Sequence, residues 1–225
     1  MIEIGFPIQP DFYFGPENDF TVRQWDTLCE PLYVPVIDHY APPPGRGEVQ
    51  FVLTRSLENS IGELVRYYAD VLRLMEKHRK KVIKHRYFFE LVPIIFAPGD
   101  KFELRYFTSE HWETATLLLH NLEQQRDGTL DDARDQGHDV EVVGWGDRLF
   151  IRVTDPDADP VIEHACVSCD RASLVRQIGP LRERTRRIRA DLRRAFEVDY
   201  WSLEWLHRAW KIPHRDWMRE VDTFL

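Results

Sequence analysis

The sequence is poor in cysteine and has no long hydrophobic run. Three cysteines occur among 225 residues, and an odd number in a chain of this length argues against a disulfide framework. No apolar run approaches the roughly 20 residues of a membrane-spanning helix. The first residues, MIEIGFPIQPDFYFG, lack the basic start and apolar core of a signal peptide. We therefore expect a soluble, cytoplasmic protein that has no membrane partner.

Motifs of the commonest enzyme classes are also missing. The sequence has no glycine-rich phosphate loop, no dinucleotide-binding fingerprint, no nucleophile elbow and no paired zinc-protease histidines. The interpretation we favour is a non-catalytic protein that has no catalytic residues and no cofactor. An enzyme of a less familiar class is the alternative.

Regular patterns of strands and helices are present. Alternating or β-branched apolar residues predict strands at 48–55, 87–107 and 138–168, the second a hairpin and the third a hairpin with a further strand. Apolar residues three and four apart predict helices over 56–81, 109–122 and 170–196, with Gly179-Pro180 breaking or restarting the last. The polar stretch 124–137 reads as a surface loop or a frayed helix end. We predict an α+β fold, a mainly antiparallel sheet of about five to seven strands with two or three amphipathic helices on one face.

The chain length suits a single domain with three successive segments. Residues 1–47 are rich in proline and read as an irregular layer over an α+β core at 48–198. Residues 199–225 hold four of the seven tryptophans and read as a helical C-terminal segment. This segment is too apolar to stay in water, so we expect it to dock on the core. A homodimer formed through it is the alternative.

The net charge of −8 hides two basic strips on an acidic body. Residues 76–86 carry six lysines and arginines against Glu76, and residues 180–196 carry seven arginines against Glu183 and Asp191, which leaves −18 on the remainder. The arginine helix could bind nucleic acid, with the candidate contacts Arg182, Arg186, Arg189 and Arg193. We favour the interpretation that the strips complement acidic groups of the protein itself or of a second copy, because an isolated DNA-binding domain is usually basic overall.

Two short motifs could hold a metal ion. His111-Trp112-Glu113 opens a predicted helix, and Cys166-Val167-Ser168-Cys169 joins a strand to a helix. Thiolates at this spacing can chelate one soft divalent ion. The two motifs resemble those of the zinc nucleobase deaminases, and that resemblance implies zinc bound by His111, Cys166 and Cys169, with Glu113 as the catalytic acid and base. Ala165 departs from the proline of that family. The other interpretation makes Cys166 a core-facing strand residue and Cys169 a residue of the turn into the helix.

Acidic residues gather in two predicted loops, between 131 and 147 and between 155 and 163. A compact α+β body with such loops could cover the basic site of a nuclease. The strand-turn-helix ending VIEHACVSCDRASLVRQI resembles small bacterial toxin-immunity proteins in pattern. That resemblance implies a protein partner, bound in our interpretation through Asp131, Asp132, Asp135, Asp139, Asp155, Asp157 and Asp159.

Overall fold

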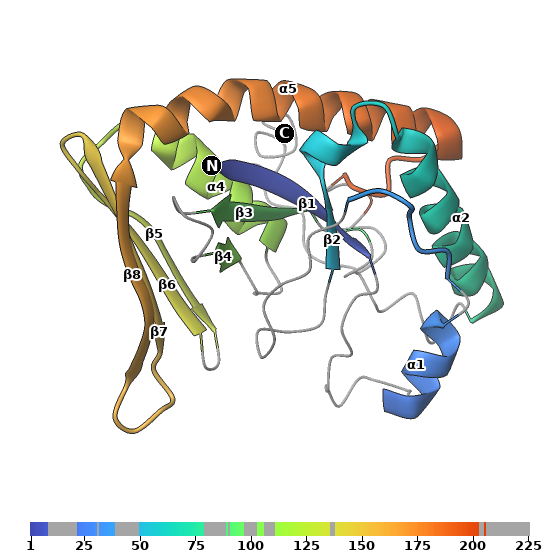
Figure 1. The fold of residues 1–225 in the computed structure, drawn as a ribbon, viewed down its shortest axis with the longest axis horizontal. Coiled ribbons are helices and arrows are strands. Elements are labelled where there is room, and N and C mark those ends of the chain that lie inside the picture. The colour runs from blue at the N-terminus through green and yellow to red at the C-terminus, as the bar shows by residue number, and fades with distance from the viewer. Residues whose placement is uncertain are drawn as a thin grey trace. The chain divides into compact units, whose positions relative to one another are not determined.

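The structure is a computed structural model that describes residues 1–8, 22–30, 32–38, 50–78, 89, 91–96, 103–105, 111–135, 138–202 and 205. Its elements, in chain order, are β1 (Ile2–Ile8), α1 (Val22–Cys29), β2 (Gln50–Leu53), a 3-10 turn (Thr54–Leu57), α2 (Ile61–Lys77), β3 (Val92–Phe96), β4 (Glu103–Arg105), α4 (His111–Glu123), β5 (Gly128–Asp135), β6 (His138–Trp145), β7 (Arg148–Asp155), β8 (Ile162–Asp170) and α5 (Arg171–Phe196) (Figure 1).

The predicted α+β class with antiparallel sheets is confirmed. The strands form two four-stranded sheets where we expected one. Sheet A has the order β2-β1-β3-β4, and sheet B is the meander β5-β6-β7-β8. No helix among the described residues combines the length and apolar character that crossing a bilayer requires.

The described chain folds into two compact units. Unit 1 contains residues 1–4 and 91–186, and unit 2 contains residues 5–90 and 187–214, each with the gaps given above. Neither unit is one continuous stretch, since β1 and α5 each contribute residues to both. Two units joined in this way are compatible with one domain, so the single domain stays a prediction.

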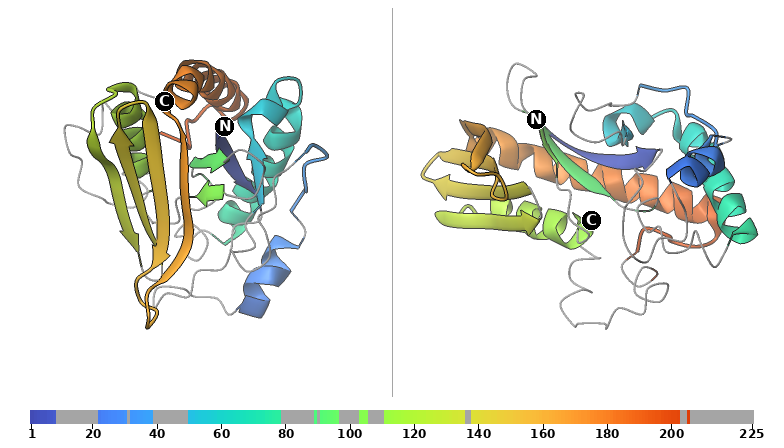
Figure 2. Two further views of the ribbon diagram at one scale, coloured as in Figure 1. Left: turned by 60° about the vertical axis from the view of Figure 1, so that its left-hand side comes forward. Right: turned by 90° about the horizontal axis from the view of Figure 1, so that it is seen from below.

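Unit 1 is built around sheet B. Helix α4 packs against β5, and α5 starts directly after β8 (Figure 2). The core of the unit consists of aliphatic side chains from one face of the sheet and from both helices, chiefly Leu118, Leu122, Val142, Leu149, Ile151, Val153, Leu174, Ile178 and Leu181. A buried ion pair at 3.0 Å joins Arg184 of α5 to Glu3 of β1, which is only 4% exposed.

Unit 2 has an aromatic core. Strand β2 pairs with the second half of β1 in the register Phe6↔Val52, and α2 buries Tyr67 and Tyr68. Trp201 is 1% exposed and its ring lies 4.7 Å from that of Tyr68, with an edge-to-face angle of 82°. The first tryptophan of the predicted C-terminal segment therefore packs inside its own chain. Residues 206–225, with Trp210 and Trp217, lie outside the described residues.

A loop of unit 2 is tied to α2 by one carboxylate. The Tyr33 hydroxyl donates to Oε2 of Glu63, and the Val36 backbone N–H donates to the same oxygen at 2.8 Å. The hydrogen bond from Tyr33 is the main reason that the pKa of Glu63 is lowered, and it raises the pKa of Tyr33. The Arg66 guanidinium lies 4.2 Å from the centre of the Tyr33 ring.

Two expected features of unit 1 are corrected. The polar stretch 124–137 contains strand β5, which pairs with β6 from Gly128↔Gly144 to Asp135↔His138. A partner strand overrode the weak local preference, and the position of β5 at the edge of sheet B leaves the Asp132 side chain exposed to water. Helix α5 continues through Pro180, because Ile178 and Leu181 on either side are fully buried. That burial offsets the roughly 3 kcal/mol that an interior proline costs.

Other expectations fall on residues that are not described. The turn of the 87–107 hairpin is one of these, although its strands β3 and β4 do pair, in the register Ile95↔Leu104. Of the basic strip at 76–86, residues 79–86 lie outside the described residues. Helix α2 ends at Lys77, four residues before the predicted end at 81. Within the proline-rich layer at 1–47, residues 22–29 form α1.

Candidate functional site

Sheet B has a buried face and an exposed face, which we call the inner and outer faces. Along β7 the side chains alternate: Leu149, Ile151 and Val153 are at most 2% exposed, whereas Arg148, Phe150 and Arg152 are exposed. Strand side chains alternate with period two, so the register assigns the outer-face neighbours on β6 and β8. The outer face carries Glu141, Val143, Trp145, Arg148, Phe150, Arg152, Cys166 and Ser168.

Polar pairs cross the strands on the outer face. Arg152 Nη2 lies 2.8 Å from Glu141 Oε2 on β6, directly opposite in the register. Arg148 donates to the Ser168 hydroxyl on β8. The charge of Arg152 is therefore compensated by Glu141, whereas Arg148 is held by a neutral hydroxyl and keeps its positive charge beside Trp145, at the end of the sheet next to the β6–β7 turn.

Carboxylates collect at the end of sheet B that lies away from α5 (Figure 1). The β7–β8 turn carries Asp155, Asp157 and Asp159, and the register places Asp139 opposite Thr154 and Asp135 opposite His138. With Glu163 these residues form what we call the acidic end. Five of the seven predicted partner-binding aspartates thus come together there. Asp131 and Asp132 lie further along β5, Asp132 opposite Glu141.

Four carboxylates of the acidic end, those of Asp139, Asp155, Asp159 and Glu163, form no ion pair with any lysine or arginine whose side chain the structure describes. Two apolar side chains stand beside these carboxylates: Val161 is 61% exposed and Ile162 is 48% exposed. The surface therefore combines uncompensated negative charge with exposed aliphatic groups.

At the opposite end of the sheet, a buried arginine fixes the β6–β7 turn. Arg171, 3% exposed, donates to the carbonyl oxygens of Gly146 and Arg126 and lies 3.2 Å from Asp127 Oδ1. The Gly146 backbone N–H donates to the same Asp127 oxygen at 3.0 Å. This network holds the turn next to Trp145, whose side chain is 71% exposed.

The cysteine pair does not form a clip. Strand β8 continues through Cys166 and Cys169 to Asp170, and side chains three residues apart on a strand point to opposite faces. Cys166 is exposed and lies opposite Arg152 on the outer face, whereas Cys169 lies opposite the buried Leu149. The alternative assignment is corrected as well, since Cys166 does not face the core and Cys169 lies within the strand.

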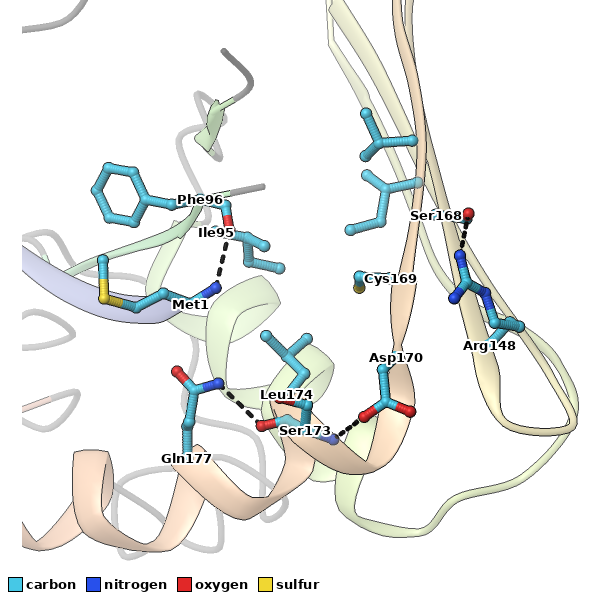
Figure 3. Close-up of a pocket in the computed structure, with 12 residues that line it drawn as sticks. Met1, Ile95, Phe96, Arg148, Ser168, Cys169, Asp170, Ser173, Leu174 and Gln177 are labelled. Atoms are coloured by element: carbon cyan, nitrogen blue, oxygen red, sulfur yellow. Dashed lines mark hydrogen bonds between the residues drawn. The ribbon is translucent and has the colours of Figure 1, made fainter. Parts of the chain in front are cut away.

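Cys169 lines a cavity of about 220 Å³ in unit 1 (Figure 3). Its side chain points towards Ile95, while Ser168 and Arg148 lie on the other side of β8. The polar groups at the cavity are bonded within the protein: Asp170 accepts from the Ser173 N–H as the helix cap, and Gln177 donates to the Ser173 carbonyl. Burial raises the pKa of the Cys169 thiol, which keeps it protonated and weakens it as a nucleophile and as a metal ligand.

The remaining members of the predicted zinc site are His111 and Glu113. Both belong to α4, but their side chains are outside the described part of the structure. Within the described part, no three His, Cys, Asp or Glu side chains are grouped so that they could hold a metal ion. The zinc site therefore stays a prediction, and the placement of the two cysteines gives it no support.

The arginines of α5 are largely used inside the protein. Arg182 pairs with Glu123 of α4 at 2.5 Å and Arg189, 8% exposed, pairs with Asp199 at 3.0 Å. Arg186 is paired with Glu183 on its own helix, and Arg193 is exposed. A phosphate backbone would have to displace these carboxylates, so the geometry favours the interpretation that the arginine strip complements the protein's own acids.

Sequence reasoning missed the aromatic side chains of the outer face. Phe150 is 44% exposed and lies opposite Val143, with Trp145 two residues further along β6. The signal was present, because Phe150 alternates with Leu149 and Ile151 and must face away from them. Comparison with known proteins identified no matching family model, no matching curated protein and no matching solved structure.

Proposed function

We propose that this protein binds another protein and performs no catalysis, and that the acidic end of sheet B contacts a basic surface of the partner. The observation that carries the proposal is the grouping of Asp139, Asp155, Asp159 and Glu163 without paired cations among the described residues. Charged patches of one sign steer oppositely charged partners and raise association rates.

Exposed aliphatic groups favour a protein as the bound species. Val161 and Ile162 stand among the carboxylates, and an inorganic cation would gain nothing from them. Protein interfaces combine apolar contacts with a charged rim. The resemblance of VIEHACVSCDRASLVRQI to small toxin-immunity proteins suggests one type of partner. This is a toxin with a basic site, which the protein would neutralise by binding to it.

The proposal is tested by comparing the proteins that the wild type captures with those that a variant captures whose acidic-end carboxylates have been replaced by neutral amides. Asp155→Asn, Asp157→Asn and Asp159→Asn together remove three charges from the acidic end. The matched control removes three exposed carboxylates of unit 2 through Glu30→Gln, Glu58→Gln and Glu76→Gln. A partner should be retained by the wild type and by the control but lost by the acidic-end variant.

Direct binding then has to follow with the purified partner. We expect the association rate to fall at least tenfold between low and high salt, because screening shortens the reach of the charges. A partner that binds the acidic-end variant as tightly as the wild type would remove the basis of the proposal.

A further inference from the structure

An aromatic patch lies on the outer face of sheet B, at the end opposite the acidic end. It consists of Val143, Trp145 and Phe150, which the β6–β7 register makes neighbours. Trp145 is 71% exposed and Phe150 is 44% exposed. Val143 and Phe150 are directly opposite, with Cβ atoms about 5 Å apart, and Trp145 is the diagonal neighbour of Phe150 at about 7–8 Å, still within reach of an aromatic side chain.

The backbone that presents this patch is held in place before any partner arrives. Val143 and Phe150 lie within the β6–β7 ladder, and Trp145 adjoins the turn that Arg171 and Asp127 fix. A large aromatic side chain on a rigid backbone loses little conformational freedom on binding. Such residues dominate the binding energy of many protein interfaces.

The charge of the acidic end selects among the species that could cover the outer face. Between the acidic end and the patch, Arg152 is paired with Glu141, so the negative charge of this face is concentrated at the acidic end. Nucleic acid would be repelled, and a second copy would bring one acidic end near another. A basic protein is attracted by the same charges.

We propose that the partner contacts the outer face at two places, with a basic cluster at the acidic end and an apolar side chain on the Val143–Trp145–Phe150 patch. This inference rests on the proposed function. The two places are separated by the length of a strand, about 20 Å for six residues. The charges then set the association rate and the patch sets the lifetime of the complex.

Two synthetic peptides of twelve residues test the inference without a known partner. Both carry the same arginine cluster at one end, and the other end carries two leucines in one peptide and two serines in the other. We expect the leucine peptide to bind the wild type about tenfold more tightly in calorimetric titration at low salt, which corresponds to about 1.4 kcal/mol. Trp145→Ser with Phe150→Ser should abolish that difference and leave the serine peptide unaffected.

A matched control removes an exposed apolar side chain elsewhere. Val36, 82% exposed in unit 2, is changed to serine and should leave the tenfold difference intact. Trp145→Ser alone replaces the double variant if circular dichroism shows that the latter does not fold.

The outcomes separate the two proposals. Equal affinity for both peptides overturns the patch and leaves the acidic end standing, whereas failure of both to bind overturns both. A leucine advantage that survives the double variant, or that disappears in Val36→Ser, also overturns the patch. If sedimentation shows a dimer that Trp145→Ser dissociates, the face belongs to a second copy and the inference is wrong.

Discussion

Replacing Gly144 with alanine should destabilise the protein markedly, because there is no room for a methyl group. A Cβ at this position would lie 2.9 Å from the Arg126 carbonyl oxygen and 3.1 Å from the Arg171 guanidinium carbon. The first is a backbone atom and the second belongs to a buried side chain, so neither can move freely. Overpacking of this kind costs about 1–3 kcal/mol.

The same change weakens a charge-assisted hydrogen bond. Arg171 donates to the Arg126 oxygen that the methyl group would displace, and hydrogen bonds to charged groups contribute about 1.5–3 kcal/mol. Alanine recovers part of this loss because it restricts the unfolded chain. We therefore expect a net loss of about 2–4 kcal/mol, and a fall in Tm of about 5–15 °C at roughly 2–4 °C per kcal/mol.

Urea unfolding followed by circular dichroism measures this loss, with Gly179→Ala as the control. Gly179 lies inside α5 and a Cβ there would meet nothing within 4 Å, so alanine should stabilise the protein by up to about 1 kcal/mol. Adding Arg171→Met to Gly144→Ala should cost less than the sum of the two single changes, because both act on one contact. A Gly144→Ala protein as stable as the wild type would refute the reasoning.

Three further predictions concern other parts of the chain. Trp201→Ala should cost about 3–5 kcal/mol, since this residue is 1% exposed within the aromatic core, and urea unfolding should show a loss well above that of Trp201→Phe. The lowered pKa of Glu63 means that its bond with Tyr33 stabilises the fold fully above about pH 4.3 and is lost as the pH falls through the lowered value. Thermal unfolding of Glu63→Gln should show a shallower acid limb than the wild type, and identical limbs would contradict this origin. With a disulfide reagent at neutral pH, exposed Cys166 should react faster than Cys169, whose pKa burial raises, and Cys166→Ser should remove the fast phase.

The positions of the strands and of the helix between 138 and 196 were predictable because local signals agree there, although the continuity of the helix at Pro180 was not. Alternating apolar residues indicate β7, and Gly146 indicates the β6–β7 turn. Asp170 is a residue type that commonly caps a helix, and it caps α5. Strand β5 was not predictable, because its sequence GTLDDARD has little strand preference and its partner β6 decides its conformation. The break expected at Pro180 was wrong for a related reason. The burial of the neighbouring residues, which keeps the helix continuous, is a tertiary effect that the local sequence does not show.

The candidate site was predictable only in part. The clustering of acids in the sequence indicated two loops, but the strand register was needed to bring Asp139 to the same end of the sheet as Asp155 and Asp159. The partners of the α5 arginines could not be read from the sequence, since Glu3 lies 181 residues from Arg184. Only one further fact was needed to predict that the two cysteines lie on opposite faces of the sheet, namely that β8 extends as far as Asp170.

The division of β1 and α5 between the two units has a consequence for the order in which the chain folds. Unit 1 needs residues 1–4 together with 91–186, and unit 2 needs residues 5–90 together with residues beyond 186. Neither core can close during synthesis until the ribosome has released most of α5. The apolar side chains of early strands such as β1 therefore stay exposed until the later residues have been synthesised. Contacts between residues this distant in sequence also make folding slow. A cut between residues 90 and 91 would separate parts of one core, so the units are not fragments that could be produced alone.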